Sequence, residues 1–253
     1  MKSIAIIGKS KVGQSLAKAI RASNKYTLTG IHAARSEKYP RLDAEVIIIA
    51  SRDDKIAEVA QKAVHSGKPE ESNLQIILHV AGSLPATVLP KQEGVFRLVL
   101  HPMQTFPKPD DSLLEGIYWM ASSDDEQAIH WARKFVAALG GKGVIELPEE
   151  SLPLYHAMTV FAANFITLIG GAIEGIATSL GQDPTLMKAA LRPLMEESLS
   201  NVLTTPAADA LTGPMRRGDF ETIRKHQAAL RRCDLKLRKI YDAFLDFAPE
   251  PRV

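Results

Sequence analysis

The sequence predicts an α/β protein, with a mostly parallel sheet in the N-terminal half followed by an all-helical C-terminal domain. Apolar runs of strand length alternate with helical patterns up to residue 148, which is typical of an open parallel sheet. After that residue only helical patterns occur. The chain of 253 residues is long enough for two domains with a core each. We place them at 1–150 and 151–253.

A glycine-rich turn near the N-terminus identifies the type of sheet. Residues 2–7 (KSIAII) form a β-branched apolar run, and a helical pattern begins about five residues after it. The intervening residues 8–13 (GKSKVG) match the dinucleotide-binding fingerprint, with serine at the middle glycine. This turn predicts a Rossmann-type domain whose helix N-terminus holds a pyrophosphate, with the Ser10 hydroxyl as a further donor. The predicted cofactor contacts are Gly8, Ser10, Lys11, Val12 and Gly13. The alternative is a tight turn without a ligand.

The end of the second predicted strand, 26–32, indicates which dinucleotide binds. An NAD site usually has an acidic residue here that accepts from the ribose 2′-hydroxyl. This chain has Arg35 and Ser36 instead, and no acid occurs between Leu28 and Glu37. A guanidinium and a hydroxyl suit a 2′-phosphate, so NADP is the expected cofactor. The alternative for Arg35 is a solvated loop arginine.

The next three predicted strands end in small or polar residues. Strand 45–50 is followed by Ser51, strand 74–80 leads to Gly82 and Ser83, and strand 97–100 runs into His101. Ligands of open parallel sheets bind outside the carboxyl ends of the strands. We therefore expect these residues to face the ligands, with Ser51 on the cofactor side. The remaining elements of this half are a helix at 55–64, a strand at 117–121, a helix at 124–139 and a strand at 143–147.

The C-terminal half predicts helices at 151–180, 185–203, 220–231 and 235–247, with a loop-rich segment at 204–219. Residues 157–173 carry no charge but include Asn164. Seventeen residues are short for a membrane span, so we expect a helix that is buried on all sides. Its small residues would permit close helix approach, which predicts a homodimer through the C-terminal helices. These are Ala162, Ala163, Gly170 and Gly171.

Composition excludes several classes of function. The net charge of +2 gives no basis for nucleic-acid or membrane-surface binding. The single cysteine, Cys233, excludes a disulfide framework and has no neighbouring Cys or His cluster, so no metal site is predicted. The N-terminus enters a strand directly and leaves no room for a signal peptide. We expect a cytoplasmic protein.

Three segments carry a resemblance to a known group of proteins. They are His101–Phe106 (HPMQTF), the helix from Tyr155 to Asn164, and Leu211–Asp219 (LTGPMRRGD) with His226. Together they resemble the superfamily whose C-terminal half is similar to that of 6-phosphogluconate dehydrogenase. It includes ketopantoate, prephenate and pyrroline-carboxylate enzymes. Within it the chain resembles a branch with a Rossmann-like domain and a C-terminal domain of unknown function. Its members are often named NADP-dependent oxidoreductases, and the resemblance covers essentially the whole chain.

The resemblance implies a catalytic position on the first C-terminal helix. Hydroxyacid dehydrogenases of this superfamily use a lysine and an asparagine four residues later. Asn164 matches the asparagine, but Val160 stands at the lysine position, and no lysine occurs between Lys142 and Lys188. His156 lies one turn earlier at i, i+4, i+8 spacing and is the best proton donor on this helix. The alternatives are a structural histidine and an asparagine that bonds another helix.

The resemblance also implies substrate contacts on the sheet side. Prephenate dehydrogenases carry a His-Pro pair similar to His101-Pro102, which places His101 in a substrate pocket. Gly82 and Ser83 resemble a loop that contacts the substrate carboxylate. His79 lies inside an apolar strand and is expected in the core.

Taken together, these features predict an NADP-dependent oxidoreductase that acts on a carbonyl or imine of a small, carboxylated substrate. The catalytic candidates are His156, Asn164 and His101. The alternative is a dinucleotide-binding sensor or regulatory protein without turnover.

Overall fold

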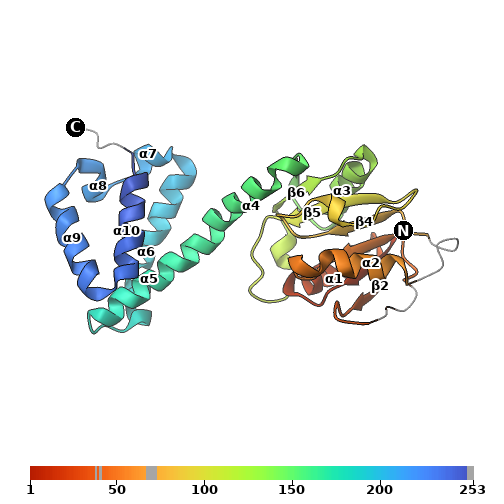
Figure 1. Cartoon of the computed structure of the whole chain (residues 1–253), viewed down its shortest axis with the longest axis horizontal. Coiled ribbons are helices and arrows are strands. Elements are labelled where there is room, and N and C mark those ends of the chain that lie inside the picture. The colour runs from red at the N-terminus through yellow and green to blue at the C-terminus, as the bar shows by residue number, and fades with distance from the viewer. Residues whose placement is uncertain (38, 40–41, 67–72, 250–253) are drawn as a thin grey trace. The chain divides into compact units, whose positions relative to one another are not determined.

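The computed structural model describes residues 1–37, 39, 42–66 and 73–249, and Figure 1 labels its elements. The chain divides into two compact units, Met1–Ala163 and Asn164–Val253. The sheet lies in the first unit, and the described part of the second unit is helical. This confirms the predicted fold class.

The first unit is built on a seven-stranded sheet with the order β2-β1-β3-β4-β5-β6-β7. Neighbouring strands pair in parallel, except that β6 runs antiparallel to β5. The carboxyl ends of β1 to β5 therefore lie at one edge of the sheet, and those of β6 and β7 lie at the opposite edge. The strands are β1 (Ser3–Ile7), β2 (Thr27–His32), β3 (Val46–Ile49), β4 (Ile76–His79), β5 (Phe96–Pro102), β6 (Tyr118–Ser122) and β7 (Gly143–Glu146).

Helices cover both faces of this sheet, which is why its strands are apolar throughout. Side chains of a strand alternate between the faces. Ile6 of β1 belongs to the core with α1 (Lys11–Ser23) and α3 (Glu126–Ala138), whereas Ile7 belongs to the core with α2 (Ile56–Val64).

Four short 3₁₀ turns lie in the described connections of the first unit. They are η1 (Asp53–Lys55), η3 (Ala86–Val88), η4 (Ser112–Leu114) and η5 (Glu149–Ser151).

The predicted helix at 151–180 is present and contains a π-helical turn. It consists of α4 (Leu152–Val160), the π turn η6 (Phe161–Phe165) and α5 (Ile166–Ser179). The predicted boundary lies at residue 150, whereas the first compact unit continues to Ala163. The physical reason is that Leu152 and Tyr155 of α4 pack with Val99 and Met120 of the sheet.

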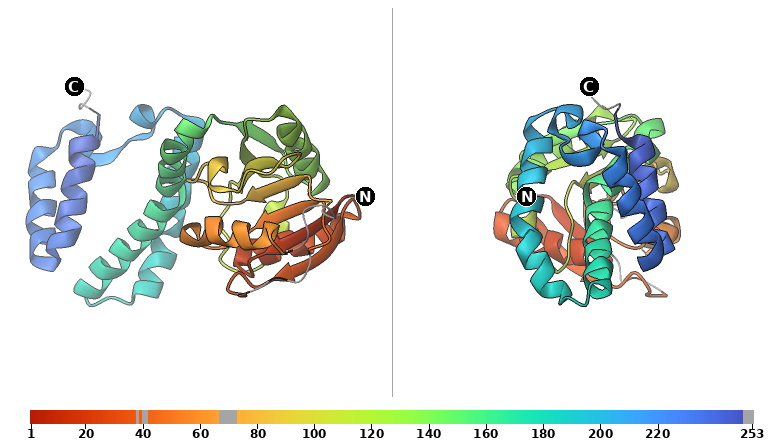
Figure 2. Two further views of the ribbon diagram at one scale, coloured as in Figure 1. Left: turned by 45° about the vertical axis from the view of Figure 1, so that its right-hand side comes forward. Right: turned by 90° about the vertical axis from the view of Figure 1, so that its left-hand side faces the viewer.

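The second unit consists of two helical hairpins with short helices between them. α5 packs against α6 (Pro184–Thr204), and α9 (Phe220–Cys233) packs against α10 (Leu235–Phe247), as Figure 2 shows. The expected loop-rich segment contains α7 (Ala207–Ala210) and α8 (Gly213–Arg217).

The apolar stretch at 157–173 differs from expectation, because it is not buried within the chain. Phe161 and Leu168 are exposed by 63% and 64%. Among the described residues, the helix Glu149–Ser179 is the one long and apolar enough to cross a membrane. Its most apolar window has a mean hydropathy of 1.7, and 6% of that window is buried. Much of its apolar surface is thus exposed in the part of the chain that the structure describes.

Candidate functional site

The β1–α1 turn has the geometry that the fingerprint requires. Gly8 has φ of +123°, a region that favours glycine. A Cβ at Gly8 would lie 2.2 Å from the carbonyl oxygen of Ala50, and one at Gly13 would lie 2.3 Å from that of Gly8. Side chains at either position would force the strand, the turn and the helix apart. The two glycines therefore hold the N-terminus of α1 at the carboxyl end of β1.

Ser10 has a different contact from the one expected. Its hydroxyl donates to the carbonyl oxygen of Ala50 (2.7 Å) and accepts from the N–H of Gly13 (3.2 Å), so it is the N-cap of α1. Its hydrogen is engaged and is not directed to a phosphate. The N–H groups of Lys11 and Val12, in the first turn of α1, have no intrahelical partner. These two groups and the helix dipole make the turn suitable for an anion.

A cavity of about 710 Å³ adjoins this turn at the carboxyl ends of β1, β2 and β3. It includes four predicted residues, Gly8, Ser10, Arg35 and Ser51, while Ser36 directly follows Arg35 in the chain. The other lining residues are Lys9, Ala33, Ala34, Ala50, Arg52, Asp54, Lys55, Glu58, Val59 and Lys62.

The cations of this cavity differ in whether they are already paired. Glu58 binds both Lys55 (2.9 Å) and Lys62 (2.8 Å), and their hydrogen bonds lower its pKa to about 2. Arg52 binds Asp54 (3.0 Å). Within the part of the chain that the structure describes, Arg35 forms no ion pair, so its charge is available to a ligand. Lys55 of η1 and Lys62 of α2 were not predicted as site residues, although both follow the third strand at helical spacing from Glu58.

A second group of polar side chains lies at the carboxyl end of β5. His101 is the penultimate residue of this strand, and its Nδ1 lies 2.7 Å from the hydroxyl of Tyr155 in α4. The ring centroids of His101 and His156 are 6.4 Å apart. Gly82, which follows β4, lies against the His101 ring, since a Cβ there would be 3.1 Å from two ring carbons. The structure thus brings together three predicted residues, with Tyr155 as an unpredicted member.

Burial sets the protonation of this group. It lowers the pKa of His101 to about 4, with the neighbouring His156 as the next cause. Burial also raises the pKa of Tyr155 to about 12. At neutral pH, His101 is therefore a neutral imidazole and Tyr155 keeps its hydroxyl hydrogen.

Ser83 and His79 complete the end of β4. The Ser83 hydroxyl donates to the carboxylate of Asp53 (3.2 Å), which follows β3. His79 is fully buried, and its Nε2 lies 3.2 Å from the carbonyl oxygen of Pro85, as expected of a core histidine. Asn164 is the first residue of the second unit and lies in the π turn. Its role stays a prediction.

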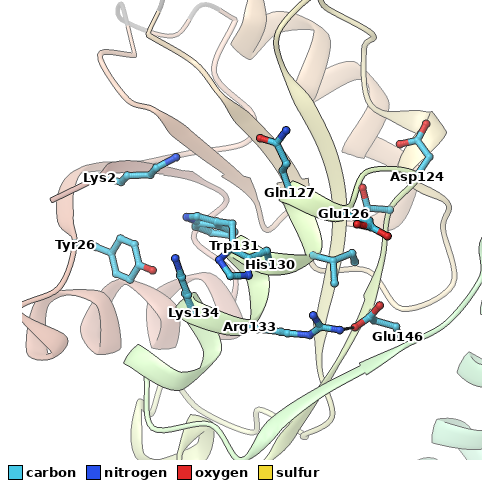
Figure 3. Close-up of a pocket in the computed structure, with 12 residues that line it drawn as sticks. Lys2, Tyr26, Asp124, Glu126, Gln127, His130, Trp131, Arg133, Lys134 and Glu146 are labelled. Carbon is cyan, nitrogen blue, oxygen red and sulfur yellow. Dashed lines mark hydrogen bonds and ion pairs between the residues drawn. The ribbon is translucent and has the colours of Figure 1, made fainter.

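Another cavity, of about 830 Å³, lies at the opposite edge of the sheet, where β1 begins and β6 ends. Figure 3 shows its lining of mixed charge, with Lys2 and Lys134 near Tyr26, and Asp124 and Glu126 farther away. None of the predicted site residues lines it. It is therefore separate from the edge where β1 to β5 end.

Comparison with known proteins assigns the family. Residues 117–246 match the family described as "Domain of unknown function (DUF2520)". The chain belongs to this family. No curated protein matches the sequence.

Solved structures similar to this DUF2520 protein share its whole architecture. One, from Bacteroides fragilis, is described as a "putative NADP oxidoreductase"; it is 20% identical with a TM-score of 0.78, and the match covers 97% of this chain and 96% of that one. Pyrroline carboxylate reductase of Plasmodium falciparum is 13% identical (TM-score 0.63; 96% and 97% covered). An imine reductase of Myxococcus stipitatus is 15% identical (TM-score 0.64; 96% and 92% covered). These similarities establish a Rossmann-like domain followed by a helical domain.

The environment of His101 predicts its titration. We expect its ring signals in NMR spectra to show no protonation between pH 8 and about 5 and a midpoint near 4. The unfolded chain protonates at an ordinary pKa of about 6.5. Between about pH 6.5 and 4 the unfolded chain binds a proton at this histidine and the folded protein does not, so the free energy of unfolding falls as the pH falls through this range. Below about pH 4 both states are protonated, and this histidine has no further effect. The signals are assigned as those missing from His101→Gln, and a midpoint near 6.5 would contradict the buried environment.

Proposed function

We propose that this protein is an NADP-dependent oxidoreductase that reduces a carbonyl or imine of a small, carboxylated substrate. The observation that carries the proposal lies in the first unit. The helix N-terminus of α1 with its cavity and the group of His101, Tyr155 and His156 occur at the same edge of one sheet. When bound, the nicotinamide cofactor would supply the hydride. The chain would supply binding, orientation and a proton.

The similar structures support this class of reaction. The Plasmodium falciparum pyrroline carboxylate reductase was solved with NADP bound, and the Myxococcus stipitatus imine reductase was solved in complex with NADP⁺. Both names refer to reactions at a C=N group. We propose the same chemical class for the DUF2520 protein, since its histidine group offers the polar contacts that a carbonyl or imine requires.

The choice of NADP rests on the end of β2. Arg35 lines the cavity without an ion-pair partner in the described part of the chain. Asp54 and Glu58, two acids of the same cavity, are neutralised by cations of η1, α2 and the residue before η1. The 2′-phosphate of NADP can therefore bind the guanidinium of Arg35, and Ser36, the next residue in the chain, offers a hydroxyl.

We assign different roles to the two histidines. A neutral imidazole is a hydrogen-bond donor but a very weak acid, so His101 binds the substrate while His156 donates the proton. Gly82 leaves room beside the His101 ring. We propose that the Ser83 hydroxyl leaves its acceptor Asp53 and donates to the substrate carboxylate when the substrate binds. Asn164 is proposed to hold the reacting oxygen or nitrogen.

A screen for turnover separates this proposal from a dinucleotide sensor. NADPH absorbance is followed against a library of keto acids and cyclic imines, with NADPH binding measured in parallel. Consumption of NADPH with a member of either class supports the oxidoreductase. Tight NADPH binding without turnover of any member would favour the sensor.

We also propose a homodimer through the C-terminal helices. α5 and α6 line a hollow of about 960 Å³ that is mostly apolar, and Leu194 beside it is exposed by 64%. Charged residues of α6, namely Lys188, Arg192 and Glu196, line the same hollow. These charges suit a second protein surface better than bilayer hydrocarbon. A second copy that buries roughly 2,000 Å² in total would cover this face.

We also propose a cytoplasmic location, because a single cysteine such as Cys233 is typical of a reducing compartment.

The cofactor assignment predicts the effect of Arg35. NADPH should bind at least about tenfold more tightly than NADH, a difference of about 1.4 kcal/mol. Arg35→Ala should remove most of this preference because it removes the available guanidinium. Calorimetry with both cofactors measures this. Arg133→Ala, at the opposite edge of the sheet, is the control and should keep the preference. Equal affinities in the unmodified protein would refute the assignment.

The role of His156 predicts a loss of turnover. His156→Ala should lower kcat by roughly 10²–10⁴ because a positioned proton donor contributes that much. NADPH affinity should stay near that of the unmodified protein, since the helix N-terminus at Gly8–Gly13 is unchanged. His101→Ala should mainly raise KM. Steady-state kinetics with a substrate from the screen measures both, and near-normal turnover of His156→Ala would remove this residue from the mechanism.

The dimer proposal is tested with two isoleucines of equal exposure. Ile169 lines the hollow at α5 and is 41% exposed, whereas Ile145 of β7 is 42% exposed. Ile169→Glu should shift a dimer to monomers, because it puts a charge into the apolar interface. Ile145→Glu should leave the dimer intact. Light scattering at micromolar concentration measures the mass, and a monomeric unmodified protein would sink the proposal.

A further inference from the structure

The side chain that contacts His101 belongs to a residue to which the sequence motifs assigned no role. Tyr155 is 4% exposed and packs with Leu152, Val99 and Met120. Its hydroxyl reaches Nδ1 of His101 at 2.7 Å. Because the phenol ring is fixed in this core, the hydroxyl has a defined position relative to the imidazole.

The hydrogen-bonding capacity of the two groups determines the direction of this bond. A neutral imidazole has one N–H donor and one acceptor nitrogen. The His101 ring is the hydrogen-bond partner found for the Tyr155 hydroxyl among the described residues. If Nδ1 carried the hydrogen, the buried hydroxyl hydrogen would have no acceptor, which costs free energy. Both groups have a hydrogen-bond partner only if the Tyr155 hydroxyl donates to Nδ1 of His101. The ring hydrogen of His101 is then on Nε2.

The other ring nitrogen is left for a ligand. Within the described part of the chain, Nε2 of His101 has no hydrogen-bond partner, yet it is not among the polar atoms shut off from solvent. The ring itself is held on one side by Gly82. His101 therefore offers a single directed donor at the ligand edge of the sheet.

We propose that Tyr155 is a positioning residue: its hydroxyl holds His101 in the neutral Nε2–H tautomer, and this N–H binds an acceptor oxygen of the substrate. The second part rests on the proposed function. It gives His101 a binding role, with no proton transferred from it. By orienting His101, Tyr155 contributes to specificity for a substrate that carries a carbonyl or carboxylate oxygen.

The tautomer is tested without a substrate. In ¹⁵N-labelled full-length protein at neutral pH, two-dimensional spectra that correlate ring nitrogens with ring hydrogens should show His101 with its hydrogen on Nε2. Tyr155→Phe removes only the hydroxyl, and it should shift His101 to a mixture of tautomers. Tyr39→Phe is the matched control. Tyr39 is 6% exposed, and its hydroxyl donates to the carbonyl oxygen of Ala34, so its loss should leave the His101 signals unchanged.

The contact with substrate is tested by kinetics. Tyr155→Phe should raise KM about tenfold, the value of one ordinary hydrogen bond, with kcat reduced less and NADPH affinity unchanged. Hydrogen on Nδ1 in the unmodified protein, or an unchanged tautomer in Tyr155→Phe, would overturn the positioning role. An unchanged KM would overturn the substrate contact. Absence of turnover in the unmodified protein contradicts the proposed function instead, and the tautomer result is independent of it.

Discussion

The close approach of the β1–α1 turn to the end of β3 is the constraint on which the ligand edge depends. Ala50 accepts from the Ser10 hydroxyl, and its own N–H donates to the carbonyl oxygen of Ile7 at 2.7 Å. A side chain at Gly8 would collide with the same Ala50 carbonyl. This contact fixes where α1 begins, and therefore where its unpaired N–H groups point. The cavity beside Arg35 and Ser51 exists because three strands end next to this one helix N-terminus.

The reversal of the sheet between β5 and β6 separates two kinds of surface. β1 to β5 bring their carboxyl ends, the glycine turn and His101 to one edge. β6 ends at the other edge, where Asp124 and Lys2 line a cavity of mixed charge. There Arg133 is paired with Glu146. The predicted site residues of the sheet are thus concentrated at the edge where β1 to β5 end.

Sequence reasoning was most successful where the signal is local and steric. The alternation of strands and helices and the glycine turn follow from short patterns, so the sheet and the position of Arg35 were predictable. Ser10 was misjudged because a serine at a glycine position suggests a phosphate donor, while its hydrogen bond to Ala50 spans 40 residues. Tyr155 was missed for a related reason. An aromatic residue in an apolar helix usually indicates core packing, and its contact with His101 spans 54 residues.

The protonation of the histidine group at the carboxyl end of β5 supports a division of roles within it. A catalytic site needs one group that binds the reacting centre and one that exchanges a proton with it. Tyr155 keeps its proton because burial raises its pKa to about 12, and burial keeps His101 neutral. Neither is therefore suited to proton exchange, and both are suited to directed hydrogen bonding. His156, whose ring lies 6.4 Å from that of His101, is the member of the group that we propose as the proton donor. Under this proposal His101, held by the hydroxyl of Tyr155, binds the substrate beside the donor.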